Sequence, residues 1–196
     1  MKAFKLLLLT SAMCALVNTA MAADGTIKFT GEITAASCVA SSGAGTSIGG
    51  EAGQQVVDVN LGKVSMDSLG GAEGLNIAAG TSINLNLDCG NTADGLKSVK
   101  FAFDPMSGSG IDLKNNSLLK TEGDAKGVGI GLFDDNNKLI NLSANEGYTA
   151  ELLKSGEGGS AKYTAALNMR AGYVANGDEL KAGIASGNLP FTLTYE

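Results

Sequence analysis

The residues whose side chains could do chemistry most clearly are the three cysteines, Cys14, Cys38 and Cys89, which could form a disulfide or bind a metal. Cys14 lies in an apolar leader that we expect to be removed, which leaves Cys38 and Cys89. Two cysteines in an exported chain favour one disulfide. The bond would close a loop of about 52 residues, worth roughly 4 kcal/mol in the chain-entropy model. Two free thiols are the alternative, and a two-cysteine metal site is disfavoured because the chain has no histidine.

No catalytic motif is matched by the sequence, because the spacing or the required residue types are missing. Without histidine there is no Ser-His-Asp or Cys-His arrangement and no common zinc site. MSGSG (106–110) misses the nucleophile pattern G-x-S-x-G, GVGIG (127–131) lacks the strand-then-helix setting of a nucleotide loop, and FDDNNK (133–138) lacks EF-hand spacing. A carboxylate pair for glycoside hydrolysis stays open, although the chain has no Trp and four Tyr. We therefore predict no enzyme, no cofactor and no metal.

The first 22 residues have the pattern of a secretory signal peptide. MKAFK supplies a basic start, residues 6–17 form an apolar run, and Ala20-Met21-Ala22 supplies a cleavage site of small residues. A membrane anchor is the alternative, but the run is shorter than the roughly 20 residues that span a bilayer. Cleavage leaves residues 23–196 as one domain, and loss of the two leader lysines changes the formal net charge from −6 to −8. Such an acidic chain is a poor partner for nucleic acid or anionic lipid.

Short runs of alternating apolar and polar residues indicate an all-β chain. The Gly/Ser-rich stretch 41–55 is expected to be a flexible loop between strands. About six to eight short strands with turns between them predict a sandwich of the immunoglobulin type. A helix is the alternative for the alanine-containing run 161–175. The expected strands span 56–65, 81–90, 98–105, a hairpin over 126–142, 161–175, and the end of the chain from 189.

The first alternating run, GTIKFTGEITAASC (25–38), carries a glycine at the centre of its apolar face. Glycine weakens a strand and buries no side chain. From the residues alone, a β-bulge in an ordinary edge strand would explain it. The apolar face consists of Ile27, Phe29, Gly31, Ile33 and Ala35.

Several segments together resemble the pilin subunits of chaperone–usher fimbriae, type 1 in style. They are TIKFTGEITAASC, NLGKVS, NLDCG, KGVGIGLFDDNNKLINL and the ending YVANG…LPFTLTYE. The ending is the most specific part, since Tyr195 is the penultimate residue and Gly183 stands fourteenth from the end. The resemblance covers residues 23–196 and implies an incomplete immunoglobulin-like sandwich that lacks its last strand. A periplasmic chaperone lends that strand, and the N-terminal extension of the next subunit replaces it at an outer-membrane usher.

The resemblance also implies roles for residues. Residues 23–36 become a donor strand and 37–196 the pilin domain, so that the apolar face fills pockets in a neighbouring subunit and Gly31 meets a shallow one. Burying the three large side chains would contribute roughly 5–9 kcal/mol. Pro190 departs from the pattern, and we expect it to shorten the pairing with chaperone or neighbour. The C-terminal strand beside the groove, recognised by the chaperone, is assigned Gly183, Leu189, Phe191, Leu193 and Tyr195.

The implied function is that of a structural subunit, a main shaft component that polymerises by donor-strand exchange with identical or related subunits and supports cell adhesion. Its route is export through the periplasm to a cell-surface fimbria, with chaperone and usher as partners. The alternative is a stand-alone secreted immunoglobulin-like binding or adhesin module with a complete sandwich. Removing residues 23–35 separates the two. A complete module would be destabilised, whereas an incomplete pilin would keep its fold when given a donor peptide.

Overall fold

The computed structural model describes residues 38–43, 46–50, 55–69 and 80–196. All of these residues belong to one compact unit, Glu32–Glu196. The expected signal peptide and donor segment lie outside the described residues. The structure therefore gives no position for Ile27, Phe29, Gly31, Ile33 and Ala35.

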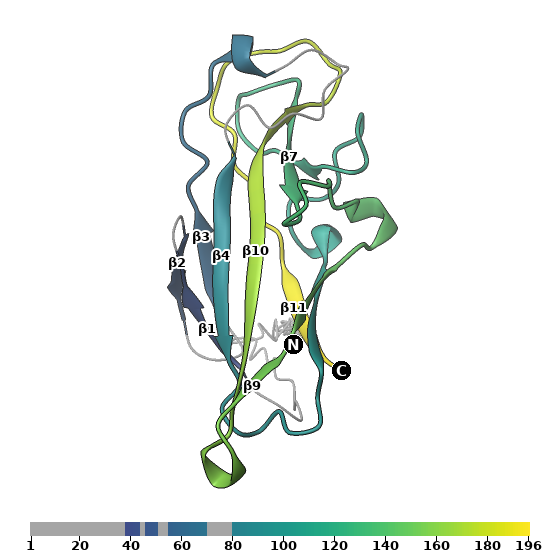
Figure 1. Ribbon diagram of the computed structural model, residues 1–196. Helices are drawn as coiled ribbons and strands as arrows, with labels where there is room; N and C mark the ends of the chain where they lie inside the picture. The colour runs from purple at the N-terminus through teal and green to yellow at the C-terminus, as the bar shows by residue number, and fades with distance from the viewer. Residues whose placement is uncertain (1–37, 44–45, 51–54, 70–79) are drawn as a thin grey trace, which may run out of the picture. The chain divides into compact units, whose positions relative to one another are not determined.

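The first sheet is built around one long strand, β10 (Lys162–Ala175), which runs for 14 residues. It pairs with β4 (Thr81–Asp88) along one side and with β7 (Val128–Phe133) along the other, and Figure 1 shows it between these two strands. Alternate side chains of β10 are buried from Tyr163 to Ala171, so the helical alternative for this segment is wrong. The remaining strands of the sheet are β1 (Val39–Ser42) beside β4, β6 (Leu119–Lys120) beside β7, and β9 (Leu153–Ser155) beside the start of β10.

The second sheet has β5 (Ser98–Phe103) at its centre, between β8 (Tyr148–Glu151) and β11 (Phe191–Tyr195). After β8 the chain crosses to the first sheet at Leu152, whose N–H donates to the carbonyl of Lys97 (2.8 Å). The β8 side of the sandwich is therefore closed by a segment that changes sheets. The β11 side has no such crossing in the described part of the chain. A separate hairpin consists of β2 (Thr46–Gly49) and β3 (Val56–Val59).

One apolar core joins the two sheets. Its buried members occupy alternate positions of the strands, which confirms the strands predicted over 81–90, 98–105 and 161–175 and makes the chain all-β, as expected. The helical residues in the described part form four short 3-10 turns, η1 (Met66–Ser68), η2 (Pro105–Ser107), η3 (Leu142–Ala144) and η4 (Gly158–Ser160). No helix among these described residues is long and apolar enough to cross a membrane. The main core side chains are Ile83, Leu85 and Leu87 in β4, Val99 and Phe101 in β5, and Tyr163, Ala165, Leu167 and Met169 in β10.

Two predicted segments differ from the structure. The stretch 41–55 is more than a loop, because it holds the end of β1 and all of β2, where Ile48 packs against the core. Small residues suffice there, since strand pairing uses the backbone. The strand predicted over 56–65 ends at Val59. The side chain of Asn60 then accepts a hydrogen bond from the N–H of Gly62 (2.9 Å) and starts a turn.

The hairpin predicted over 126–142 has a very short return. After β7, the carboxylate of Asp134 accepts hydrogen bonds from the N–H groups of Asn136 (2.9 Å) and Lys138 (2.8 Å), which closes the turn. Leu139 then forms a single bridge with Phe133. The chain leaves the sheet for η3, so the return segment does not extend into a full strand.

Candidate functional site

The hydrogen bonds between β5 and β11 determine which way each peptide group of β11 points. Ser98 and Glu196 exchange both of their main-chain hydrogen bonds, at 2.9 and 3.0 Å. In an antiparallel pair, bonded and non-bonded residue pairs alternate. Thr194 and Thr192 therefore also direct their N–H and C=O groups at β5, opposite Lys100 and Ala102.

The same alternation turns the peptide groups of Phe191, Leu193 and Tyr195 away from β5. Among the described residues, no strand pairs with this edge of β11. The side chains of the three residues are half-buried and pack against the core, while Thr192 and Thr194 are exposed. β11 thus combines an unpaired backbone edge with an apolar face that points inward. Such an edge is a template for another strand.

A second unpaired edge belongs to β3. Its partner within the described part of the chain is β2 alone. Val57, Val59 and the following Leu61 are half-buried against the same core as the inward side chains of β11. We call β3 and β11 the open edges. They share one core but do not pair with each other.

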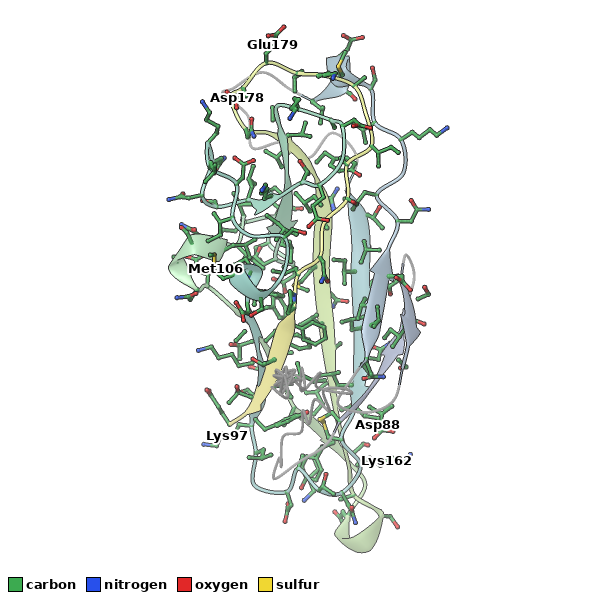
Figure 2. All side chains as sticks on the ribbon, turned by 180° about the vertical axis from the view of Figure 1, so that it is seen from behind. Asp88, Lys97, Met106, Lys162, Asp178 and Glu179 are labelled. Atoms are coloured by element: carbon green, nitrogen blue, oxygen red, sulfur yellow. A yellow bond between two sulfur atoms is a disulfide. The ribbon has the colours of Figure 1, made fainter. Side chains whose placement is uncertain are left out.

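The predicted disulfide between Cys38 and Cys89 is confirmed. It joins the residue before β1 to the residue after β4. Figure 2 shows the bond close to the labelled Asp88. The backbone N–H of Cys38 also donates to the hydroxyl oxygen of Tyr195, 3.3 Å away. The start of the described chain is thereby tied both to the main sheet and to the end of β11.

Gly183 lies outside β11, in a segment that runs antiparallel to residues 122–126. The N–H of Ala125 donates to the carbonyl of Ile184 (3.1 Å) in this contact. A Cβ atom on Gly183 would sit 2.5 Å from the backbone nitrogen of Ala125, so the position requires glycine for close approach. Its place is thus explained by packing within the domain.

The segment between Gly183 and β11 is held by a tyrosine of the first sheet. The hydroxyl of Tyr173 in β10 donates to the carbonyl of Ala185 (2.6 Å). Burial raises the pKa of Tyr173 above its ordinary value, which keeps the phenol protonated as a donor. Leu189, two residues before β11, is half-buried against the core. The approach to β11 is therefore fixed from the first sheet.

Pro190 does not disturb the open edge. Its carbonyl accepts a hydrogen bond from the N–H of Asp104 (2.8 Å), so its peptide groups face β5. The donor that proline lacks would also have pointed at β5. Pro190 therefore removes no donor from the open edge, and whether it shortens the pairing with an added strand stays a prediction.

The described residues contain no group of three or more Cys, Asp or Glu side chains arranged to hold a metal ion. An open hollow lies beside η3 and β8, on the opposite side of β5 from β11, and is lined in part by Asp134, Asp135, Glu146 and Tyr148. Burial, with a smaller contribution from Asp135, raises the pKa of Tyr148, so its phenol stays protonated and supplies no phenolate.

Sequence reasoning missed the role of β3. The run was predicted as a strand from its alternation, but nothing in it identified β3 as the edge that faces the same core as β11. The signal was the phase of Val57, Val59 and Leu61, which continues past the end of the strand. The predicted C-terminal residues Phe191, Leu193 and Tyr195 do lie together on β11.

A family model described as "Fimbrial protein" matches residues 27–196. The chain is 32% identical over 195 residues to long polar fimbria protein A of Salmonella typhimurium, covering 98% of this chain and 97% of the relative. It is 32% identical over 182 residues to the probable major fimbrial subunit LpfA of Escherichia coli O157:H7, covering 92% and 88% of the two chains. The type-1 fimbrial protein subunit of Serratia marcescens is 27% identical over 197 residues, covering 100% of both.

The fold has a solved counterpart. A chain in the structure of a chaperone–usher pilus superposes with a TM-score of 0.51 at 21% identity, covering 88% of this chain and 95% of that one. At this level of identity the likeness concerns the fold, and it agrees with the predicted immunoglobulin-like sandwich.

Proposed function

The chain belongs to the fimbrial protein family and is a structural subunit of a cell-surface fimbria, and from that premise we propose that it polymerises by taking a donated strand between β3 and β11. The observation that carries the proposal is the edge of β11. Phe191, Leu193 and Tyr195 turn their peptide groups outward while their side chains face the core. An added strand would pair with these groups and place its own alternate side chains on the same core.

The donor is residues 23–36 of an identical or related subunit. Alternation in that segment puts Ile27, Phe29 and Ile33 on one face, which suits a site that buries every second side chain. Gly31 on the same face meets a shallow part of the site. Because each subunit carries both a donor segment and an open edge, it forms a repeating link of the fimbrial shaft.

A periplasmic chaperone covers the site before assembly, and an outer-membrane usher is where the exchange occurs. The subunit needs such a chaperone because an exposed strand edge beside apolar side chains promotes aggregation. A borrowed strand from a chaperone satisfies the same peptide groups until the donor replaces it. The role of the chain is structural, and we infer no catalytic activity for it.

Strand exchange with a synthetic peptide tests this function. The purified chaperone–subunit complex is mixed with a peptide of residues 23–36, and free chaperone is followed on a native gel. The peptide should displace the chaperone. A control peptide with Phe29→Ser and Ile33→Ser should not, because its inward face is polar.

Failure of the unmodified peptide to bind would contradict the proposal. A chain lacking residues 23–35 supplies the second arm of the test. If that chain were destabilised and gained nothing from the peptide, the segment would belong to its own domain. The protein would then be a complete stand-alone module.

A further inference from the structure

The side chain of Gln55 imitates a neighbouring strand. Its Oε1 accepts a hydrogen bond from the N–H of Ala40 (3.1 Å), and its Nε2 donates to the carbonyl of the same residue (3.0 Å). A primary amide can do this because it carries both a donor and an acceptor. Gln55 directly precedes β3, so this pair of bonds fixes the start of one open edge to β1.

The register of β1 explains why Ala40 is available. The N–H of Gly43 donates to the carbonyl of Asn84 (2.7 Å), in line with the antiparallel pairing of β1 and β4. Counting back by alternation, Ser41 and Val39 direct their peptide groups at β4, whereas Ala40 directs its groups away. Gln55 therefore satisfies a donor and an acceptor that the sheet leaves unpaired.

Tyr195 makes the corresponding contact from the other open edge. Its hydroxyl accepts the hydrogen bond from the N–H of Cys38 (3.3 Å), while its ring packs against the core. Cys38 is fixed to the main sheet by the disulfide to Cys89, whose own N–H donates to the carbonyl of Tyr163 (2.9 Å). The two contacts thus fall on residues only two positions apart, Cys38 and Ala40.

We propose that Gln55 and Tyr195 are positioning residues that brace the two open edges against residues 38–40 and set the spacing between β3 and β11 at that end. The inference rests on the proposed strand addition. A strand inserted between two edges must lie about 4.8 Å from each, so the edges must stand roughly two strand spacings apart. If the hydrogen bonds of Gln55 or Tyr195 to residues 38–40 are lost, the spacing between β3 and β11 varies. The inserted strand is then released faster.

Three variants of the full mature chain test the brace. Gln55→Met keeps the length of the side chain without its hydrogen bonds, Tyr195→Phe removes only the hydroxyl, and Thr192→Ala changes an exposed side chain of β11 as the control. Each purified chaperone–subunit complex is loaded with a labelled peptide of residues 23–36. Release of the peptide is then followed by fluorescence. Tyr195→Phe, which loses one ordinary hydrogen bond, should release the peptide about five-fold faster than wild type. Gln55→Met loses two and should release it at least as fast as Tyr195→Phe, whereas Thr192→Ala should release it at the wild-type rate.

A fourth variant, Gln55→Glu, separates hydrogen bonding from volume. At neutral pH its carboxylate has no donor for the carbonyl of Ala40, but below its ordinary pKa of about 4.3 it regains one. Release from Gln55→Glu should therefore return toward the wild-type rate near pH 3.5, whereas release from Gln55→Met should not. The other titratable side chains in β1 to β4 are Asp58 and Asp88, and they are common to all variants.

The outcomes distinguish the positioning role of Gln55 and Tyr195 from the proposed strand addition on which it rests. Wild-type release rates in Gln55→Met and Tyr195→Phe, or the same pH profile for Gln55→Glu and Gln55→Met, would overturn the brace. If the wild-type complex never takes up the peptide, the proposed function fails instead, and the brace fails with it.

Discussion

The ring of Phe191 stacks on the ring of Phe101, with centroids 5.7 Å apart and planes inclined by 29°. Phe101 is buried at the centre of β5, whereas Phe191 is only half-buried. β11 is therefore fastened to its own sheet by side-chain packing and by the hydrogen bonds along one edge. Its other edge remains available for a partner.

Replacement of Phe191 should weaken the domain itself. Phe191→Ala removes the stacking and leaves a gap beside Phe101, at an expected cost of about 2 kcal/mol because the side chain is half-buried. Urea unfolding of the mature chain loaded with the 23–36 peptide measures the change in the free energy of unfolding. Thr192→Ala, which is exposed, should stay within about 0.5 kcal/mol of wild type. Equal losses in the two variants would contradict the assigned packing.

Removal of the disulfide should be costly. Replacing Cys38 and Cys89 together by alanine frees a closed loop and should lower the free energy of unfolding by roughly 4 kcal/mol. Mass spectrometry of non-reduced peptides from secreted protein should find the two cysteines linked. Detection of both thiols free would contradict the bond in the exported chain.

Gly183 should be intolerant of any side chain. Gly183→Ala places a Cβ atom 2.5 Å from the backbone nitrogen of Ala125 and should cost about 1–3 kcal/mol. Gly159→Ala is the matched control, because a Cβ there meets no atom within 4 Å. Thermal unfolding of the two variants should separate them clearly. A Gly183→Ala chain as stable as Gly159→Ala would show that the close approach to Ala125 is relieved at no cost.

Gly31 should matter for joining subunits. Gly31→Leu in the donor peptide should slow strand exchange with the chaperone–subunit complex, because overpacking a tight site typically costs about 1–3 kcal/mol. Thr30→Leu is the control, since Thr30 lies on the opposite face of the strand. In the intact chain, Gly31→Leu should block polymerisation while the chaperone-bound yield is unchanged. Equal exchange rates for the Gly and Leu peptides would contradict the shallow pocket.

Alternation alone predicted much of the sandwich. From Ile83 to Leu87 in β4 and from Tyr163 to Ala171 in β10 every second side chain is buried, and the count of exported cysteines predicted the disulfide. β11 was recognisable from Phe191, Leu193 and Tyr195, which share one phase. These features are local, so a period of two residues or a count is sufficient to detect them.

The remaining features depend on contacts between distant residues. Gly183 is required by the backbone of residues 124–125, almost sixty positions earlier, and no local pattern encodes that approach. The direction of the Pro190 carbonyl follows from the register that Ser98 and Glu196 set, which decides the direction of every peptide group in β11. The positioning role of Gln55 likewise depends on its hydrogen bonds to Ala40, fifteen positions earlier, which no local pattern encodes.

The most direct test of strand addition at β11 is amide hydrogen exchange in the isotope-labelled chain that lacks residues 23–35, measured without and with the 23–36 peptide. The N–H groups of Thr192 and Thr194 point at β5, so they should be protected in both states. Those of Phe191, Leu193 and Tyr195 should exchange readily in the unloaded chain and become strongly protected when the peptide binds. Protection of all five groups before the peptide is added, or no gain at Leu193 after it binds, would contradict the account.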